Sequence, residues 1–202
     1  ALDYRVSGVD GALRENVRAY LGTPPKEDAA VARALEAARG RVAEALQALG
    51  YYRPVIELRT LDADGRALGA AAAPAEVARL EVRIDPGERV RLGAVRIGIV
   101  GEATEDPALA ERVKESALVP GAPLDHGRYT DFKRELQTRA RARGYLDGRF
   151  TSHSLRVDPA AGVAEVELVF AGGARYSFGS VRYDEAQLDR ERLKALMPFA
   201  PG

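Results

Sequence analysis

The stretch that decides the fold is VARALEAARGRVAEALQALGYYRPVIEL, residues 31–58. Its first part spaces apolar residues three or four positions apart: Val31, Leu35, Ala38, Val42, Leu46 and Leu49. This spacing predicts one long amphipathic helix that ends at Gly50, because glycine readily takes the left-handed conformation that closes many helices. Beyond it, apolar and charged residues alternate over 55–61, which predicts a half-buried strand. The helix and the strand must cover each other's apolar faces.

Composition limits the class of protein. The 202 residues are 46% hydrophobic and 30% charged, which suffices for a packed core. Thirty basic residues balance thirty acidic ones, which argues against a dedicated nucleic-acid binder with a basic face. Cysteine is absent, so disulfides and thiolate metal sites are excluded. No apolar run approaches the roughly 18 residues of a membrane helix, and no signal peptide is recognised, so we expect a soluble piece.

The patterns around the opening stretch predict the order β-α-α-β-β over residues 1–86. A strand at 2–7 and the turn Gly8–Gly11 lead into a short helix, for which Asp10 is the expected cap. The long helix and the strand at 55–61 follow. A turn at 62–65 and a small-residue loop at 70–73 then precede a last strand with three inward-facing residues: Leu80, Val82 and Ile84.

The same order returns over residues 87–172. Asp106-Pro107 predicts a helix start, and the next helix ends at Gly144-Tyr145 as the earlier one ends at Gly50-Tyr51. Strands are expected near 150–157 and 163–170, with a bulge in the former because its alternation is poor. A third copy opens at 173–202 and is truncated. The sequence therefore predicts a tandem array with domains at 1–86, 87–172 and 173–202.

Five stretches carry a resemblance to a known family: GVDGALRENVR at 8–18, LQALGYYRP at 46–54, RGYLD at 143–147, RYSFGSV at 175–181 and LMPF at 196–199. Together with the repeated β-α-α-β-β unit, they resemble the POTRA (polypeptide-transport-associated) domains of the Omp85 superfamily, in particular its TamA family. The alanine-rich loop 66–74 departs from the family pattern. The resemblance implies an α+β fold of tandem POTRA domains. In each, a three-stranded mixed sheet with the third strand in the centre packs on two helices.

The resemblance also implies a place and partners. It implies the periplasmic face of the outer membrane of a Gram-negative bacterium, with membrane contact only through a barrel that this chain lacks. The expected partners are a long inner-membrane-anchored protein of the TamB type and nascent outer-membrane proteins. No cofactor and no nucleic acid are expected. Two alternatives stay open: the POTRA region of another Omp85 member, such as a barrel-assembly or two-partner secretion transporter, and a passive spacer arm.

The candidate partner-binding site is the edge of the second strand. Its residues are Val55, Ile56, Glu57, Leu58, Arg59 and Thr60. An extended partner segment can add to such an edge through backbone hydrogen bonds, and here only Pro54 and two charged side chains defend it. Ile56 is expected to face the core, so Glu57→Pro is the preferred probe of edge pairing.

Other motifs have structural interpretations. The pairs Gly50-Tyr51 and Gly144-Tyr145 are predicted helix caps rather than binding aromatics. The turn Gly8-Val9-Asp10-Gly11 fits the GxxG pattern of RNA-binding KH loops, but Asp10 would lie against the phosphate, so a turn with a cap is favoured.

No catalytic or metal-binding residue is predicted. His126 and His153 lack metal-ligand spacing. The run Ser152-His153-Ser154 suggests a nucleophile beside a base, but adjacent side chains on a strand point to opposite faces. The sequence therefore predicts a protein that is not an enzyme.

Overall fold

A computed structural model describes residues 2–177 and residue 179. The chain folds into two compact units. Unit 1 comprises the described residues up to Arg96, together with Ala117–Asp131 and Ser154–Val166. Unit 2 comprises Ile97–Ser116, Phe132–His153 and the described residues from Glu167 onward. Most of the third copy predicted at 173–202 lies outside the described residues.

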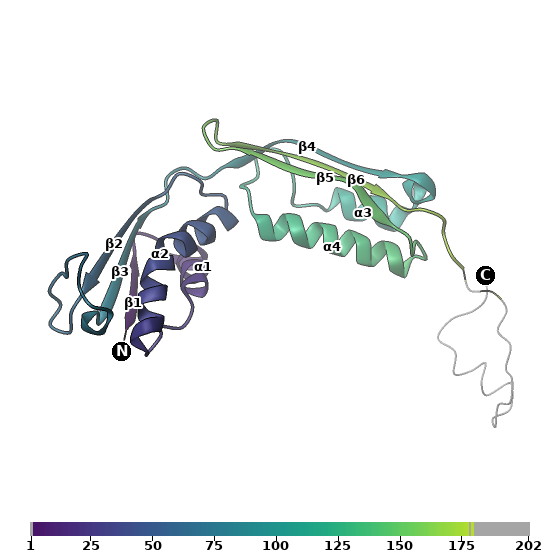
Figure 1. The fold of residues 1–202 in the computed structure, drawn as a ribbon. Coiled ribbons are helices and arrows are strands. Elements are labelled where there is room, and N and C mark those ends of the chain that lie inside the picture. The colour runs from purple at the N-terminus through teal and green to yellow at the C-terminus, as the bar shows by residue number, and fades with distance from the viewer. Residues whose placement is uncertain (1, 178, 180–202) are drawn as a thin grey trace, which may run out of the picture. The chain divides into compact units, whose positions relative to one another are not determined.

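The first sheet and its helices lie wholly in unit 1. In chain order the elements are β1 (Asp3–Ser7), α1 (Gly11–Leu21), α2 (Asp28–Ala48), β2 (Val55–Leu61), the short 3-10 helix η1 (Pro74–Glu76) and β3 (Arg79–Asp85). The sheet has the order β1-β3-β2, with β1 parallel and β2 antiparallel to β3. Figure 1 shows α1 and α2 on one face of this sheet. The predicted β-α-α-β-β order and the central third strand are confirmed, whereas η1 was not predicted.

The core of this repeat lies between α2 and β3. Val42 and Leu46 of α2 are completely buried. Alternate β3 residues face them: Leu80, Val82 and Ile84 are at most 2% exposed. The α1 side chain of Asn16 donates to the Ala45 carbonyl of α2 at 2.7 Å, which ties the two helices together. The apolar stripe read from the sequence is therefore the face that packs, apart from half-buried residues such as Leu35.

The second sheet repeats this topology. Its elements are β4 (Arg91–Val100), the 3-10 helix η2 (Gly101–Glu105), α3 (Pro107–Lys114), α4 (His126–Ala142), β5 (Arg149–Asp158) and β6 (Val163–Ala171). The order β4-β6-β5 again puts the third strand in the centre. Phe170 of β6 is fully buried and packs edge-on against Phe150 of β5 at 5.2 Å between ring centroids. Exposure along β5 stops alternating at Ser154 and Leu155, where the bulge stays a prediction.

Both long helices end in the same way. Gly50 has φ of 90°, its N–H donates to the Gln47 carbonyl at 2.9 Å, and the Tyr51 N–H donates to the Leu46 carbonyl at 3.0 Å. Gly144 has φ of 94°, with the corresponding bonds from Gly144 N–H and Tyr145 N–H, both at 3.0 Å. This bond pattern is the Schellman motif, which satisfies carbonyls that a helix end leaves unpaired.

Replacing Gly50 with alanine is expected to destabilise unit 1 by about 2 kcal/mol, the upper end of the strain of a left-handed non-glycine residue. The added Cβ would lie 2.6 Å from the Leu124 carbonyl oxygen, so the strain cannot relax freely. Chemical unfolding followed by circular dichroism measures the loss. Gly40→Ala is the control, because no atom outside its helix lies within 4 Å of the added Cβ. The control should gain about 0.5–1 kcal/mol, and equal losses in both variants would contradict the argument.

The predicted N-cap position of Asp10 is confirmed, but capping by its side chain is wrong. Asp10 occupies the N-cap position of α1, but its side chain makes no capping hydrogen bond. Its carboxylate instead accepts a hydrogen bond from the Arg14 guanidinium, one turn later on the helix. Arg14 also donates to the Val9 carbonyl at 2.8 Å. The arginine thus holds the turn and competes for the carboxylate that would otherwise cap the helix.

Candidate functional site: the free edge of β2

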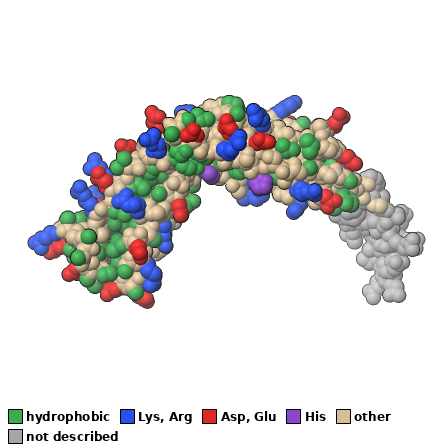
Figure 2. Space-filling view, turned by 45° about the horizontal axis from the view of Figure 1, so that its top comes forward, with side chains coloured by type: hydrophobic (Ala, Val, Ile, Leu, Met, Phe, Trp, Pro, Cys, Tyr) green, Lys and Arg blue, Asp and Glu red, His purple; other side chains and the backbone are tan. Residues whose placement is uncertain are grey.

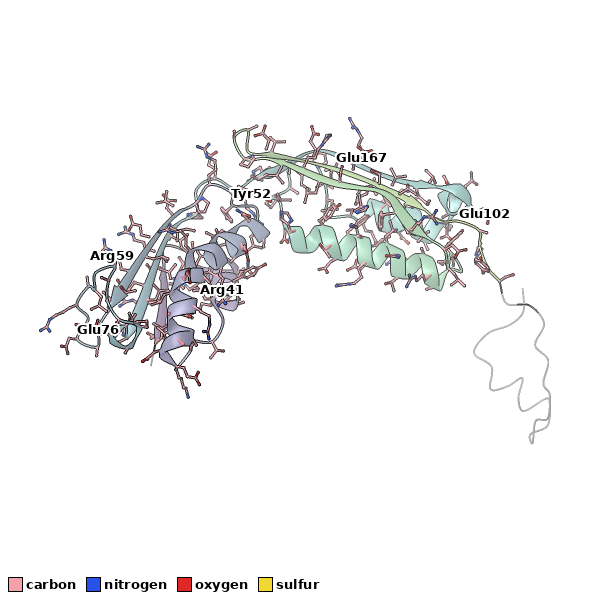
Figure 3. All side chains as sticks on the ribbon, viewed as in Figure 1. Arg41, Tyr52, Arg59, Glu76, Glu102 and Glu167 are labelled. Atoms are coloured by element: carbon pink, nitrogen blue, oxygen red, sulfur yellow. The ribbon has the colours of Figure 1, made fainter. Side chains whose placement is uncertain are left out.

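The six candidate residues all lie on β2, and β2 forms an edge of the first sheet. The strand pairs with β3 from Val55 opposite Asp85 to Leu61 opposite Arg79. On its other side, the described part of the chain supplies no neighbouring strand of the sheet. The predicted edge position is therefore confirmed. Side chains alternate along it: Val55, Glu57 and Arg59 are exposed on the face away from the helices, where Figure 3 labels Arg59.

Two hydrogen bonds show which backbone groups point away from β3. The Ile56 carbonyl accepts from an Arg39 guanidinium nitrogen of α2 at 2.7 Å. The Thr60 carbonyl accepts from the Leu68 N–H at 2.8 Å. Because alternate residues of an antiparallel strand point to the same side, Ile56, Leu58 and Thr60 direct their N–H and C=O groups outward. Leu58 carries the outward N–H and C=O that lie between the two occupied carbonyls.

This alternation shows that Glu57→Pro, the preferred substitution from the sequence, is the wrong test of edge pairing. Glu57 lies opposite Arg83 of β3 and alternates with the outward-pointing residues Ile56 and Leu58, so its N–H points toward β3. Glu57→Pro would therefore break the internal ladder rather than test the outer edge. Sequence periodicity predicts which face a side chain takes. The direction of the N–H groups depends instead on which side the neighbouring strand lies, and that is a property of topology.

The C-terminal half of the edge is covered by Arg66–Leu68, which we call the strap. Ala67 pairs with Leu61 in an antiparallel bridge. The Asp62 N–H donates to the Arg66 carbonyl at 3.0 Å, and the Leu68 N–H donates to Thr60 at 2.8 Å. The sequence predicted the turn at 62–65 but not the strap, because one apolar residue among small neighbours has no strand periodicity.

A hollow of about 420 Å³ adjoins the edge. It is lined by residues of α2, β2, β3 and the segment after β2: Leu35, Leu58, Arg59, Thr60, Ala67, Leu68, Ala70 and Leu80. Its aliphatic side chains come from both layers of the repeat and from the strap. A strand added along β2 would direct every second side chain to the same face of the sheet, so that one beside Leu58 could enter this hollow.

Charge near the site is mixed. Figure 2 shows acidic and basic side chains interspersed over the visible face. On the first sheet, Arg79 pairs with Asp3 at 3.4 Å and Arg5 approaches Glu81 at 4.0 Å. Because charges of both signs are paired on this sheet, the surface has no strong potential of either sign. The edge therefore offers a partner backbone and apolar contacts rather than a charged patch.

The two histidines lie on different elements, His126 on α4 and His153 on β5. His126 Nε2 lies 2.7 Å from the Tyr52 hydroxyl, while His153 is exposed on β5. Burial raises the pKa of Tyr52. Among the described residues, no three potential ligands gather around a common metal position. None of the described helices is both long and apolar enough to cross a bilayer.

The segment that forms the first sheet and its edge also matches a protein-family model. Residues 3–86 match the model described as POTRA domain TamA domain 1. Residues 3–86 are therefore similar to a POTRA domain of the TamA type. The match covers β1 to β3, and therefore the whole candidate edge. The resemblance inferred from the sequence is confirmed there, and the second sheet repeats the POTRA topology.

Solved structures of POTRA regions are similar to this chain at low identity. Haemophilus influenzae BamA POTRA3-5 is 15% identical with a TM-score of 0.48, covering 100% of this chain and 77% of that chain. Haemophilus influenzae BamA POTRA4 is 20% identical with a TM-score of 0.34, covering 43% and 94%. The N-terminal domain of Omp85 from Thermosynechococcus elongatus is 15% identical with a TM-score of 0.39, covering 99% and 76%.

Proposed function

We propose that this chain is the periplasmic POTRA array of an outer-membrane assembly factor and that its β2 edge docks an extended segment of a partner protein. The observation that carries the proposal is the outward N–H and C=O of Leu58 beside an apolar hollow. Backbone hydrogen bonds would supply affinity with little sequence demand, and the hollow would receive a side chain. This combination suits a module that accepts many β-rich clients.

The proposed partners are a TamB-like inner-membrane-anchored protein and nascent outer-membrane proteins. The family of residues 3–86 supports this choice and the periplasmic location. The role is docking rather than catalysis. The proposal includes the array division predicted at 1–86, 87–172 and 173–202. The family match over residues 3–86 supports a POTRA unit in the first part.

The variant Leu58→Pro is expected to weaken partner binding at least about tenfold, because it removes an outward donor worth roughly 1 kcal/mol and its ring obstructs the incoming strand. Calorimetric titration with the C-terminal segment of the TamB-like partner measures the change. Leu58→Ala is the matched control, since it shortens the same side chain and keeps the N–H. Circular dichroism establishes that both variants fold.

The comparison between the two variants decides the proposal. If the folded proline variant binds as tightly as the alanine variant, backbone pairing at this edge is wrong. If parent and variants alike show no binding, the array acts as a spacer for this partner.

A further inference from the structure

The strap already pairs with the outer edge of β2 through backbone hydrogen bonds, as an added strand would. Its residues run antiparallel to β2, with Ala67 opposite Leu61. Its two ladder bonds use the Thr60 carbonyl and the Asp62 N–H, at 2.8 and 3.0 Å. An incoming strand that paired along the whole of β2 would need the same Thr60 carbonyl. The strap and such a strand therefore exclude each other.

The segment that contains the strap has a hydrogen-bonded turn at each end and few buried side chains between them. On one side the Asp62 carboxylate accepts from the Arg66 N–H at 2.8 Å, and on the other the Glu76 carboxylate accepts from the Ala73 N–H at 2.9 Å. Between them, Arg66 and Ala67 are exposed and Leu68 is the half-buried residue that packs against the core cluster. The following Gly69–Ala73 offers only small side chains. The strap can therefore leave β2 without breaking the β2–β3 ladder.

We propose that the strap is the resident occupant of this edge and is displaced by a partner segment that runs antiparallel to β2 and places an aliphatic side chain where Leu68 lies. The proposal rests on the proposed function, strand addition at β2. Its direction comes from the strap's own pairing, and its aliphatic residue from the hollow that Leu35, Leu58 and Leu80 line. The strap lies in the alanine-rich loop, where this sequence departs from the family pattern.

A disulfide lock can hold the strap in place. Leu61 and Ala67 form a pair flanked by the two ladder bonds, which is the close, non-hydrogen-bonded type. Such pairs have Cα atoms about 4.5 Å apart, within the disulfide range. The chain has no cysteine, so Leu61→Cys with Ala67→Cys yields this disulfide alone. Because both redox states share the substitutions, their comparison isolates the position of the strap.

The probe is a fluorescent synthetic peptide that copies residues 62–73, titrated by anisotropy into the full chain. A second variant, Leu68→Asp, frees the strap by placing a charge on its half-buried anchor. We expect this opened variant to bind the peptide at least about tenfold more tightly than the parent, because the tethered strap competes at high effective concentration. The oxidised lock should bind at least about tenfold more weakly than its reduced form. The same peptide with aspartate in place of its leucine should bind the opened variant at least about tenfold more weakly.

The outcomes separate the two proposals. If parent, opened and locked proteins bind the peptide equally, the edge accepts a strand but the strap does not guard it, and this inference alone is overturned. If the opened variant binds no peptide, strand addition at β2 fails and the inference falls with it. If the aspartate peptide binds as tightly as the original, the aliphatic requirement is wrong.

Discussion

Gly8→Ala is expected to destabilise the first repeat by about 2–5 kcal/mol, the sum of left-handed strain and overpacking. Gly8 has φ of 85°, a conformation that L-residues with a side chain rarely adopt. An added Cβ would also lie 2.0 Å from the Ile84 carbonyl oxygen, a backbone atom of the central strand β3. Backbone in the middle of a sheet cannot move aside without breaking its ladder. Chemical unfolding of the first repeat, followed by circular dichroism, measures the loss.

The neighbouring Gly11 supplies the control. It also has a left-handed φ, 52°, but no atom lies within 4 Å of its added Cβ. Gly11→Ala should therefore lose only the roughly 1–2 kcal/mol of backbone strain. A loss at Gly8 no larger than that at Gly11 would refute the packing argument. The close approach of Gly8 to β3 accounts for the first glycine of the GxxG motif without any nucleic acid.

Local sequence patterns predicted most of the first repeat. The apolar stripe of residues 31–46 and the glycine after it specify where α2 ends, because both depend on neighbours along the chain. The strand at 55–61 was predicted with its observed bounds, since its alternation is clean. Asp106 was predicted to start a helix, and it does cap α3 with its side chain.

The features that the sequence did not predict depend on contacts between residues far apart in the chain. The outward direction of the Leu58 N–H follows from the position of β3, which no local pattern contains. The strap depends on pairing across a turn, and Arg66–Leu68 has no alternation to reveal it. Asp10 failed as a side-chain cap because Arg14, at helical spacing, offered its carboxylate a charged partner. The sequence was sufficient to locate the candidate edge, but not to tell which backbone N–H and C=O groups of β2 point outward.

The carboxylate of Asp106 stabilises unit 2 through three hydrogen bonds. Asp106 is 5% exposed, and it accepts from the N–H groups of Ala108 at 3.0 Å and Leu109 at 3.4 Å. Arg143 Nε of the same unit donates to its other oxygen at 3.0 Å. Burial acts to raise the pKa of Asp106, but the hydrogen bonds from Arg143 and the backbone, with the arginine charge, outweigh burial and lower this pKa.

Asp106→Ala is therefore expected to destabilise unit 2 by about 2–5 kcal/mol, combining a lost N-cap with a lost charged hydrogen bond. Asp106→Asn should lose less, because asparagine is an equally good N-cap and forfeits mainly the charge that faces Arg143. The difference between the alanine and asparagine variants then measures the cap. Unfolding in urea at neutral pH gives both values, and equal losses would show that the cap contributes nothing.

The asparagine variant also tests the lowered pKa through the dependence of stability on pH. A carboxyl group whose pKa is lower in the folded state stabilises the protein fully above its unfolded pKa of about 3.9, and this contribution fades as pH falls through the folded pKa. The parent should therefore exceed Asp106→Asn in stability at neutral pH, and the gap should shrink as the pH is lowered below about 3.9. Asparagine does not titrate, so other carboxylates affect both proteins alike and cancel in the difference. A gap that stays constant over this range, measured by urea unfolding at each pH, would mean that the pKa of Asp106 is not lowered and that Arg143 contributes packing rather than charge.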